Sequence, residues 1–265
     1  MPLKVRLKIS LIILIFIAII VTTFILSIMI HPAFILISVV LLITGLYLLY
    51  VYYPKFDPSG YSIYKLRGKG RCIALTFDDG PDPVTTPEIL DILKTYSINA
   101  AFFCVGERAE RYPEIIKRIR EDGHILGNHG YSHTKLHNRS LRFIRDEIEK
   151  SERVLNPLTE INGYKLFRTP HGFKSLRLVR DLKKRNYILV GWTRGIWDTD
   201  GSDANTLLKR AEAYLRDGVI YLLHDGRDIV GSSTNTVEFL RKFIPILHNR
   251  GYRIITITDT IEKKR

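Results

Sequence analysis

Two long apolar runs occupy the start of the chain. Residues 9–30 carry no charged side chain, His31 and Pro32 follow, and residues 33–53 again carry none. A helix of about 20 apolar residues is long enough to cross the hydrocarbon core of a bilayer. The pattern therefore predicts two transmembrane helices, at about 9–30 and 33–53, which form a hairpin with its tip at His31-Pro32.

A secretory signal peptide is the alternative for the first run, because Lys4, Arg6 and Lys8 precede it. Signal peptides have an apolar region of about 7–15 residues, followed by a cleavage site of small residues. The first run is longer than that and no such site follows it, so the membrane hairpin is favoured.

A different pattern begins after a stretch rich in Pro and Gly at 54–70, which is typical of a linker. Beyond it, short apolar runs alternate with amphipathic segments such as 87–93 and 113–119, each of which begins at a proline. The expected strands are 72–77, 100–105, 124–127, 166–167, 187–192, 219–223 and 253–257. Alternating strands and helices predict a parallel sheet. So many units in one domain, residues 71–265, predict an α/β fold of the distorted (β/α)7-barrel type.

Adjacent acids stand at the end of the first expected strand. Asp78 and Asp79 follow the run 72–77 and precede Gly80-Pro81. Barrels of this kind keep their chemistry at the C-terminal ends of the strands. Because neighbouring carboxylates repel each other, a metal cation or unequal roles for the two acids would explain the pair.

Two histidines four residues apart follow the third expected strand. On a helical turn His129 and His133 would share one face. One carboxylate would complete a three-ligand metal site with an open position, and Asp79 is a candidate for it. The spacing alone is weak evidence, since chance pairs of surface histidines are common.

Further candidates lie at or just after the ends of three other expected strands. Arg168 is either an ordinary surface cation or, at a barrel mouth, a partner that orients Asp78. His224 ends the run 219–223, where a lone histidine is often structural. Trp192 and Trp197 flank another strand end, where tryptophans more often belong to the core than to a site.

Together these stretches resemble the polysaccharide deacetylases of carbohydrate esterase family 4. The resemblance spans roughly residues 71–260 and includes all five signature stretches of that family in order. The matching positions are Thr76–Pro81, His129 with His133, Arg168 with Pro170, a variant at 192–198 whose acid is Asp198, and Ile220, Leu222 and His224. Two positions depart from the family pattern, because Gly130 stands where Ser or Thr is usual and His171 replaces Tyr.

The resemblance implies separate roles for the two acids. Asp79, His129 and His133 would hold a divalent metal, with zinc favoured by nitrogen and oxygen ligands and cobalt or nickel as alternatives. Asp78 would be the general base that takes a proton from the metal-bound water.

The resemblance also implies an acid and a substrate pocket. His224 would protonate the leaving amine, with its pKa raised by Asp198. The backbone N–H of His171 would bind the oxyanion, and Pro170 and Trp197 would lie at the substrate.

The implied function is that of a membrane-anchored, metal-dependent hydrolase that removes N-acetyl or O-acetyl groups from a glycan. One alternative is a deformylase or deacetylase of a lipid-linked amino sugar, which suits a membrane hairpin. A cyclic amidase of related fold would not need both histidines. An inactive glycan-binding membrane protein would have lost ligands or the acid, whereas here every role is filled.

Charge and cysteine content add two expectations. The net charge is +13, and because the apolar runs and their leader hold three cations and no acid, the remainder carries +10. This favours anionic partners such as phospholipid headgroups or an acidic glycan, while no aromatic-interleaved basic motif supports nucleic acid. Cys72 and Cys104 lie in apolar runs, which predicts buried free thiols rather than a disulfide.

The expected location is the cell membrane, with two crossings and both termini on one side. A single crossing would leave 33–53 on the membrane surface without a polar face. Cations flank both runs, and the positive-inside rule would place that side in the cytoplasm. The family's glycans lie outside the cell, however, and favour an outward-facing catalytic domain.

Overall fold

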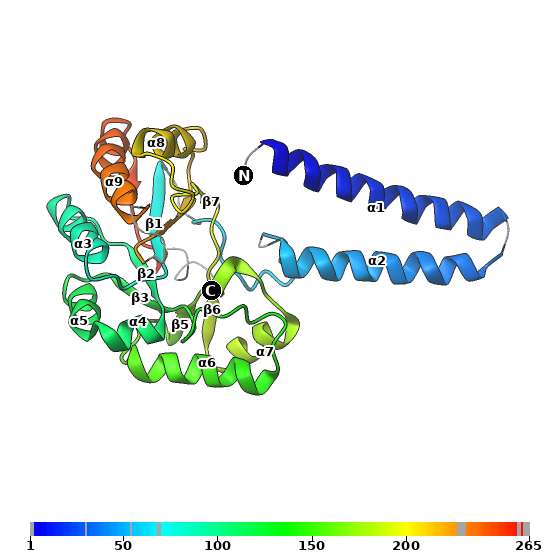
Figure 1. The fold of residues 1–265 in the computed structure, drawn as a ribbon, viewed down its shortest axis with the longest axis horizontal. Coiled ribbons are helices and arrows are strands. Elements are labelled where there is room, and N and C mark those ends of the chain that lie inside the picture. The colour runs from blue at the N-terminus through cyan, green and yellow to red at the C-terminus, as the bar shows by residue number, and fades with distance from the viewer. Residues whose placement is uncertain are drawn as a thin grey trace. The chain divides into compact units, whose positions relative to one another are not determined.

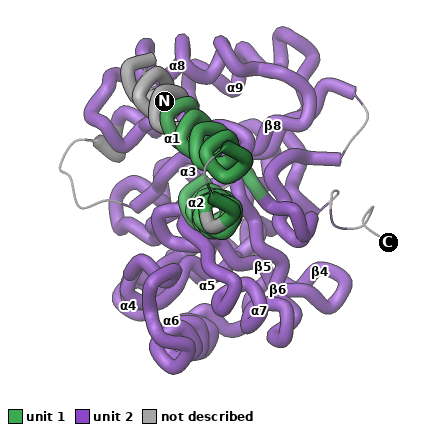
Figure 2. The backbone as a smooth tube through the Cα atoms, turned by 90° about the vertical axis from the view of Figure 1, so that its right-hand side faces the viewer, with its two compact units in different colours: residues 1–56 green, residues 57–265 purple. Residues whose placement is uncertain are grey.

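The computed structural model describes residues 3–29, 31–53, 55–67, 70–226, 232–258 and 261. The chain divides into two compact units, Met1–Phe56 and Asp57–Arg265 (Figure 2).

The first unit is a pair of helices, α1 (Leu3–Met29) and α2 (Ala33–Tyr52) (Figure 1). The Ser38 hydroxyl of α2 donates a hydrogen bond of 2.7 Å to the Thr23 hydroxyl of α1. Among the described residues, Phe34–Tyr52 is the one segment long and apolar enough to cross a membrane, with a mean hydropathy of 2.6, and Leu14–Met29 is shorter. The helical hairpin is therefore present, but two membrane crossings are not confirmed, since one apolar helix near the N-terminus also fits a signal sequence.

The second unit is an α/β fold built on a mixed sheet. Its strands are β1 (Cys72–Asp78), β2 (Ala101–Cys104), β3 (Ile125–Asn128), β4 (Glu160–Ile161), β5 (Tyr164–Phe167), β6 (Tyr187–Leu189), β7 (Arg194–Gly195), β8 (Val219–His224) and β9 (Arg253–Ile254). Parallel pairing gives the order β6-β5-β3-β2-β1-β8-β7, with β9 beside the start of β1 and β4 antiparallel to β5. All seven expected strands are present, although β6 and β9 end earlier than predicted. The two-residue strands β4 and β7 are too short to produce a periodic pattern.

Helices cover the outside of this sheet (Figure 1). They are α3 (Thr85–Thr95), α4 (Gly106–Arg111), α5 (Pro113–Glu121), α6 (Leu141–Val154), α7 (Leu176–Lys184), α8 (Ala204–Glu212) and α9 (Ser232–Asn249), with a 3-10 turn at Pro170–Gly172. The amphipathic pattern explains the packing, because α5 begins at Pro113 and buries Ile115, Ile116 and Ile119. Cys72 and Cys104 are buried free thiols, as predicted.

The segment before β1 belongs to the core, which corrects the predicted linker 54–70. Ile63 and Leu66 are buried in the main apolar cluster. The Ile63 N–H donates to the Leu189 carbonyl at 2.9 Å, and the Leu66 N–H donates to the Gly218 carbonyl at 2.9 Å. Residues 54, 68 and 69 of that stretch lie outside the described residues.

This segment stands where the sheet is interrupted, because in the described chain no ladder joins β6 to β7. It is hydrogen-bonded to the end of β6 and to Gly218, which directly precedes β8. The compact unit consequently starts at Asp57 rather than at residue 71.

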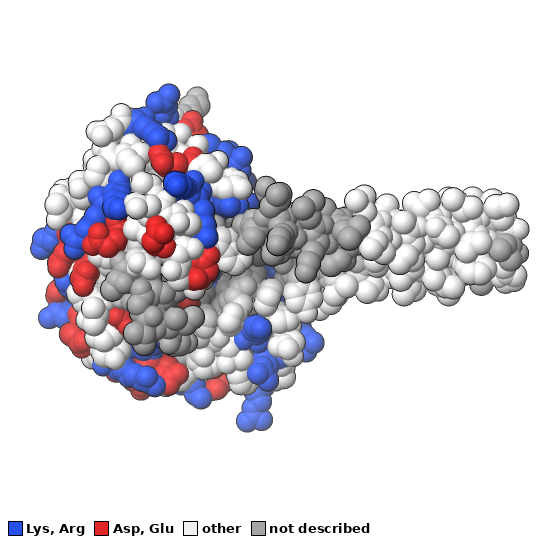
Figure 3. Space-filling model, turned by 45° about the horizontal axis from the view of Figure 1, so that its top comes forward, with Lys and Arg blue, Asp and Glu red and all other residues white. Residues whose placement is uncertain are grey.

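Charge is distributed differently in the two units. On the face of the second unit that Figure 3 shows, Lys and Arg are interspersed with Asp and Glu, whereas the described part of the hairpin surface there is uncharged. The net positive charge is therefore not gathered into one basic patch on this face.

Candidate active site

The acid pair and the predicted acid histidine meet at one edge of the sheet. Asp78 is the last residue of β1, and its register partners are Phe103 on β2 and His224 on β8. Asp79 follows with a left-handed backbone, φ 72°. Because β1 and β8 are parallel neighbours, reactive residues from distant parts of the sequence lie side by side at this edge.

A fully buried arginine fixes one of the two acids. The Arg168 Nη1 lies 2.6 Å from Asp78 Oδ1 and 2.8 Å from the Thr76 hydroxyl, and Nη2 donates to the Gly191 carbonyl at 2.9 Å. A buried guanidinium needs such complete pairing, because an unpaired charge is costly away from water. Arg168 is therefore not a surface cation, and it occupies one oxygen of Asp78.

The other acid faces two imidazoles. Asp79 Oδ1 lies 3.3 Å from His129 Nε2 and 2.9 Å from His133 Nε2. One donor atom from each of the three side chains lies within 4.8 Å of the others. The cluster thus offers one carboxylate oxygen and two imidazole nitrogens.

The orientation of His129 tests whether this cluster suits a metal. Its Nδ1 lies 2.9 Å from the Arg168 carbonyl oxygen. A carbonyl only accepts, so Nδ1 carries a proton, and Nε2, which faces Asp79, is the nitrogen that can bind a cation once it has lost its own proton. This tautomer is the one that a metal ligand requires, and the three residues therefore fit a divalent cation.

Protonation inside the cluster follows from the same contacts. Burial would raise the pKa of Asp79, but hydrogen bonds from His129 and His133 outweigh burial and hold that pKa below its ordinary value. Burial would likewise lower the pKa of His133, but Asp79 outweighs it and raises that pKa. A cation bound here would take the place of protons.

A second carboxylate–imidazole pair, Asp198 and His224, lies at the same edge of the sheet. His224 Nδ1 lies 2.9 Å from Asp198 Oδ1, and Asp198 Oδ2 accepts from the His224 N–H at 2.8 Å and from the Thr236 hydroxyl at 3.0 Å. Burial would lower the pKa of His224, but the buried Asp198, with smaller contributions from Asp79 and Asp78, raises it to about 9. The contact with Asp198 therefore favours the protonated form of His224.

Of the predicted pocket residues, His171 lies beside the metal cluster, whereas Trp197 is partly exposed. The His171 ring centroid lies 4.7 Å from that of His133, and Pro170 beside it is buried. Trp197 is 45% exposed, and among the described residues no hydrogen bond or ring contact ties its side chain to the cluster. His171 and Trp197 both have left-handed backbones, φ 59° and 61°, and such strain in non-glycine residues often accompanies functional loops.

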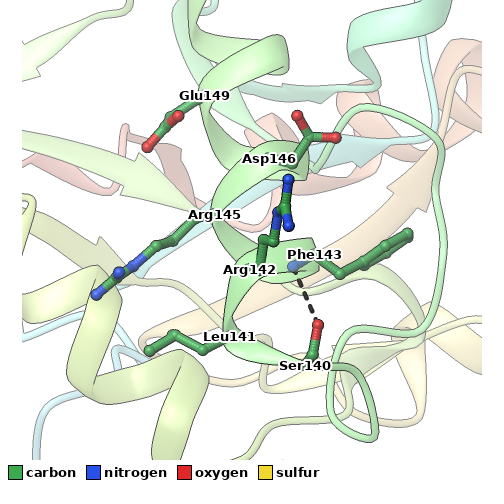
Figure 4. Close-up of a pocket in the computed structure, with 7 residues that line it drawn as sticks. All are labelled: Ser140, Leu141, Arg142, Phe143, Arg145, Asp146 and Glu149. Carbon is green, nitrogen blue, oxygen red and sulfur yellow. Dashed lines mark hydrogen bonds between the residues drawn. The ribbon is translucent and has the colours of Figure 1, made fainter.

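A cavity of about 530 Å³ opens onto Asp79 and His133. Its other walls come mainly from the loop after β1 and from α4, and they include Arg108, Arg111 and Asp82. A larger hollow of about 710 Å³ lies on α6 (Figure 4). It contains none of the predicted site residues, so the site belongs to the smaller cavity.

Two buried acids near the site were not predicted. Asp225 accepts from the Thr86 hydroxyl at 2.7 Å and donates its N–H to the Asp78 carbonyl at 3.1 Å. Burial, with the charges of Asp79 and Asp78, raises the pKa of Asp225 to about 7. Glu147 binds the loop that carries His133. The sequence does mark Glu147 as unusual, because it is an acidic residue on the apolar face of the helix, beside Ile148.

Comparisons with known proteins place the chain in one family. The family model for polysaccharide deacetylase matches residues 65–190. A peptidoglycan-N-acetylglucosamine deacetylase of Bacillus cereus is 31% identical over 220 residues, which cover 79% of this chain and 97% of that protein. A chitooligosaccharide deacetylase of Azorhizobium caulinodans is 31% identical over 190 residues, 69% of this chain and 90% of its own.

Solved structures show the same fold. The Bc1960 peptidoglycan N-acetylglucosamine deacetylase superposes with a TM-score of 0.70 at 34% identity, covering 76% of this chain and 92% of that chain. BA3943 of Bacillus anthracis, a CE4 family pseudoenzyme, gives a TM-score of 0.68 at 26% identity, with 79% and 71% covered. From its family match, its relatives and its fold, the chain belongs to the polysaccharide deacetylase family, carbohydrate esterase family 4.

Proposed function

We propose that this protein is a metal-dependent hydrolase that removes N-acetyl, or O-acetyl, groups from a glycan. The observation that carries the proposal is the meeting of three separately held groups at one edge of the sheet. These are the Arg168–Asp78 pair, the Asp79, His129 and His133 cluster, and the Asp198–His224 pair.

The two acids of the pair have different partners, and this difference supports different roles. Arg168 holds Asp78 Oδ1, while Asp78 Oδ2 lies 3.8 Å from His129 Nε2, on the side of the cluster. Oδ2 is thus the oxygen that can take a proton from an attacking water. Asp79, His129 and His133 would hold the divalent ion, with zinc favoured, which when bound supplies Lewis-acid chemistry.

The leaving group needs a proton, and His224 is placed to give one. With Nδ1 bound to Asp198, its Nε2 is the nitrogen that can face the substrate. The oxygen of water forms a bond to the acetyl carbon, the carbon–nitrogen bond breaks, and the amine leaves with the proton from His224. The His171 N–H would bind the oxyanion, a contact worth about 3 kcal/mol in comparable enzymes. The products are acetate and a free amino sugar.

The similarity to BA3943 shows that the fold by itself does not establish activity, since that protein is a pseudoenzyme. Activity is proposed from the residues, which fill each role. The direct test incubates the full-length protein with chitooligosaccharide and with peptidoglycan, and follows acetate and free amine by mass spectrometry. Absence of both products on every N-acetylated substrate, with metal supplied, would favour a glycan-binding protein instead.

Metal content gives a separate prediction. The purified protein is expected to carry about one divalent ion per chain, because three donors converge on one point. The His129→Ala/His133→Ala double variant should lose that ion, and chelation should inactivate the wild type. Elemental analysis by mass spectrometry checks both, and equal metal content in variant and wild type would refute the ligand assignment.

We also propose that residues 1–53 anchor the enzyme in the cell membrane by two crossings, with the catalytic unit facing outward. The apolar helix α2 supports an anchor. It also gives a reason to include a lipid-linked amino sugar among the substrates tested, since an anchored site would meet such a sugar at the membrane surface.

Tags at both ends test this topology in intact protoplasts. The hairpin predicts that both tags lie on the same side, so external protease should remove both or neither. Removal of both places the catalytic unit outside, and removal of one alone would contradict two crossings. A cytoplasmic protein that stays intact throughout is the control for leakage.

A further inference from the structure

We propose that Glu147, on α6, is a positioning residue that holds the loop carrying the metal ligand His133. The inference rests on the proposed metal site at Asp79, His129 and His133. Glu147 itself contacts none of these three side chains, and it acts through the backbone between the two histidines.

Both oxygens of Glu147 are used by this loop. Oε2 accepts the N–H of Tyr131 at 3.1 Å and that of Ser132 at 2.9 Å, and Oε1 accepts the Ser132 hydroxyl at 2.9 Å. The side chain is 5% exposed, and among the described residues no lysine or arginine forms an ion pair with it. A buried carboxylate of this kind is stabilised by its hydrogen bonds, and here all of them come from one loop.

The same loop is also held by hydrogen bonds from α4. The Gly130 and Tyr131 carbonyls accept the N–H groups of Gly106 and Glu107, each at 2.9 Å. The first turn of α4 therefore binds the carbonyls, while Glu147 binds the N–H groups. Two helices thus fix the Gly130–Tyr131 and Tyr131–Ser132 peptide planes, in the loop that leads to His133.

The backbone conformation of the loop explains why it needs these hydrogen bonds. Gly130 and His133 have φ of 79° and 56°, in the left-handed region. A histidine there is strained, and such conformations persist when the surrounding structure holds them in place. Without Glu147, the loop can relax toward ordinary backbone angles, and His133 Nε2 would then move from its place 2.9 Å from Asp79. Outer partners of this kind typically change metal affinity by about 10–100-fold.

The test compares three variants of the full-length protein. Glu147→Met keeps the length of the side chain and removes both acceptors. Glu147→Gln keeps one acceptor oxygen for the two amides, and its NH₂ group can donate to Ser132. Glu149→Met is the matched control, because Glu149 lies on the same helix at the outer hollow and pairs with Arg185 instead (Figure 4).

Zinc affinity is measured by competition with a chromophoric chelator, after circular dichroism has shown each variant to be folded. Glu147→Met is expected to bind zinc about 10–100-fold more weakly, while Glu147→Gln and Glu149→Met stay close to wild type. The activity of Glu147→Met should also recover as zinc is raised, which a general loss of structure would not allow. Folded Glu147→Met with wild-type zinc affinity would overturn the inference, and a wild type that binds neither zinc, cobalt nor nickel would overturn the metal site itself.

A measurement on the wild type decides the matter even if Glu147→Met does not fold. The Tyr131 and Ser132 amides should exchange slowly with solvent in the metal-free protein, because a buried carboxylate holds both. If both amides exchanged at the rate of an unstructured peptide, Glu147 would not hold the loop and the inference would be overturned.

Discussion

Asp78→Asn is expected to lower turnover on an N-acetylated glycan by about 10²–10⁴-fold while the metal stays bound. Asparagine keeps the size of the side chain and an oxygen that can accept from Arg168, but it cannot take a proton from water. The metal cluster is untouched, since Asp79, His129 and His133 remain. Turnover and metal content measured on the same preparation test both parts of this expectation.

Asp91→Asn is the matched control for the loss of one negative charge. Asp91 pairs with Arg118 through a side chain that is 69% exposed, on the outer helix α3, and exposed pairs contribute little to stability. The control should keep its activity. Near-normal turnover in Asp78→Asn would rule out Asp78 as the base, and loss of metal from that variant would place Asp78 among the ligands.

His224→Ala is the second change with a large expected effect, again about 10²–10⁴-fold in turnover. In the wild type the pKa of His224 is raised to about 9 by Asp198, against the effect of burial. A group with a raised pKa keeps its proton below that value and loses it as pH rises, so the rate should fall on the alkaline side. A bound divalent ion opposes the contribution of Asp79, which places that limb near or below pH 9. His224→Ala should have no such limb.

Asp198→Asn makes the assignment specific, because it removes the charge and keeps the histidine. The pKa of His224 should fall, and the alkaline limb should move to lower pH. The pH dependence of kcat/KM for the wild type and both variants is the measurement. An unchanged alkaline limb in Asp198→Asn, or a limb retained in His224→Ala, would assign the proton to another group.

The two adjacent acids, Asp78 and Asp79, are tolerated because the fold gives them different environments. Asp78 is held by a buried guanidinium, whereas Asp79 faces two imidazoles that lower its pKa. Their backbones differ as well, since Asp78 ends a strand and Asp79 has φ 72°. These different partners and backbone conformations underlie the separate roles proposed above.

Most of the strands and helices, and the family, could be predicted from the amino-acid sequence. Apolar runs such as 72–77 and amphipathic segments such as 113–119 have periods that depend only on local backbone geometry, so the strands and helices could be expected at these places. The positions of Asp78, His129 and His224 at strand ends followed from the same pattern. That these three residues lie close together could also be predicted, because parallel strands bring their C-terminal ends to one edge.

Which of these groups pair with each other depends on how distant segments fold together. The Arg168–Asp78 contact joins residues 90 positions apart, and Asp198–His224 depends on the short strand β7 lying beside β8. The sequence around Ile63 is typical of a linker, because two buried residues in an irregular stretch give no periodic pattern. Such features depend on register between distant segments, which local periodicity does not encode. Glu147 shows the same limit: its position on an apolar helix face was visible in the sequence, but the backbone amides that bind it come from a loop folded against that helix.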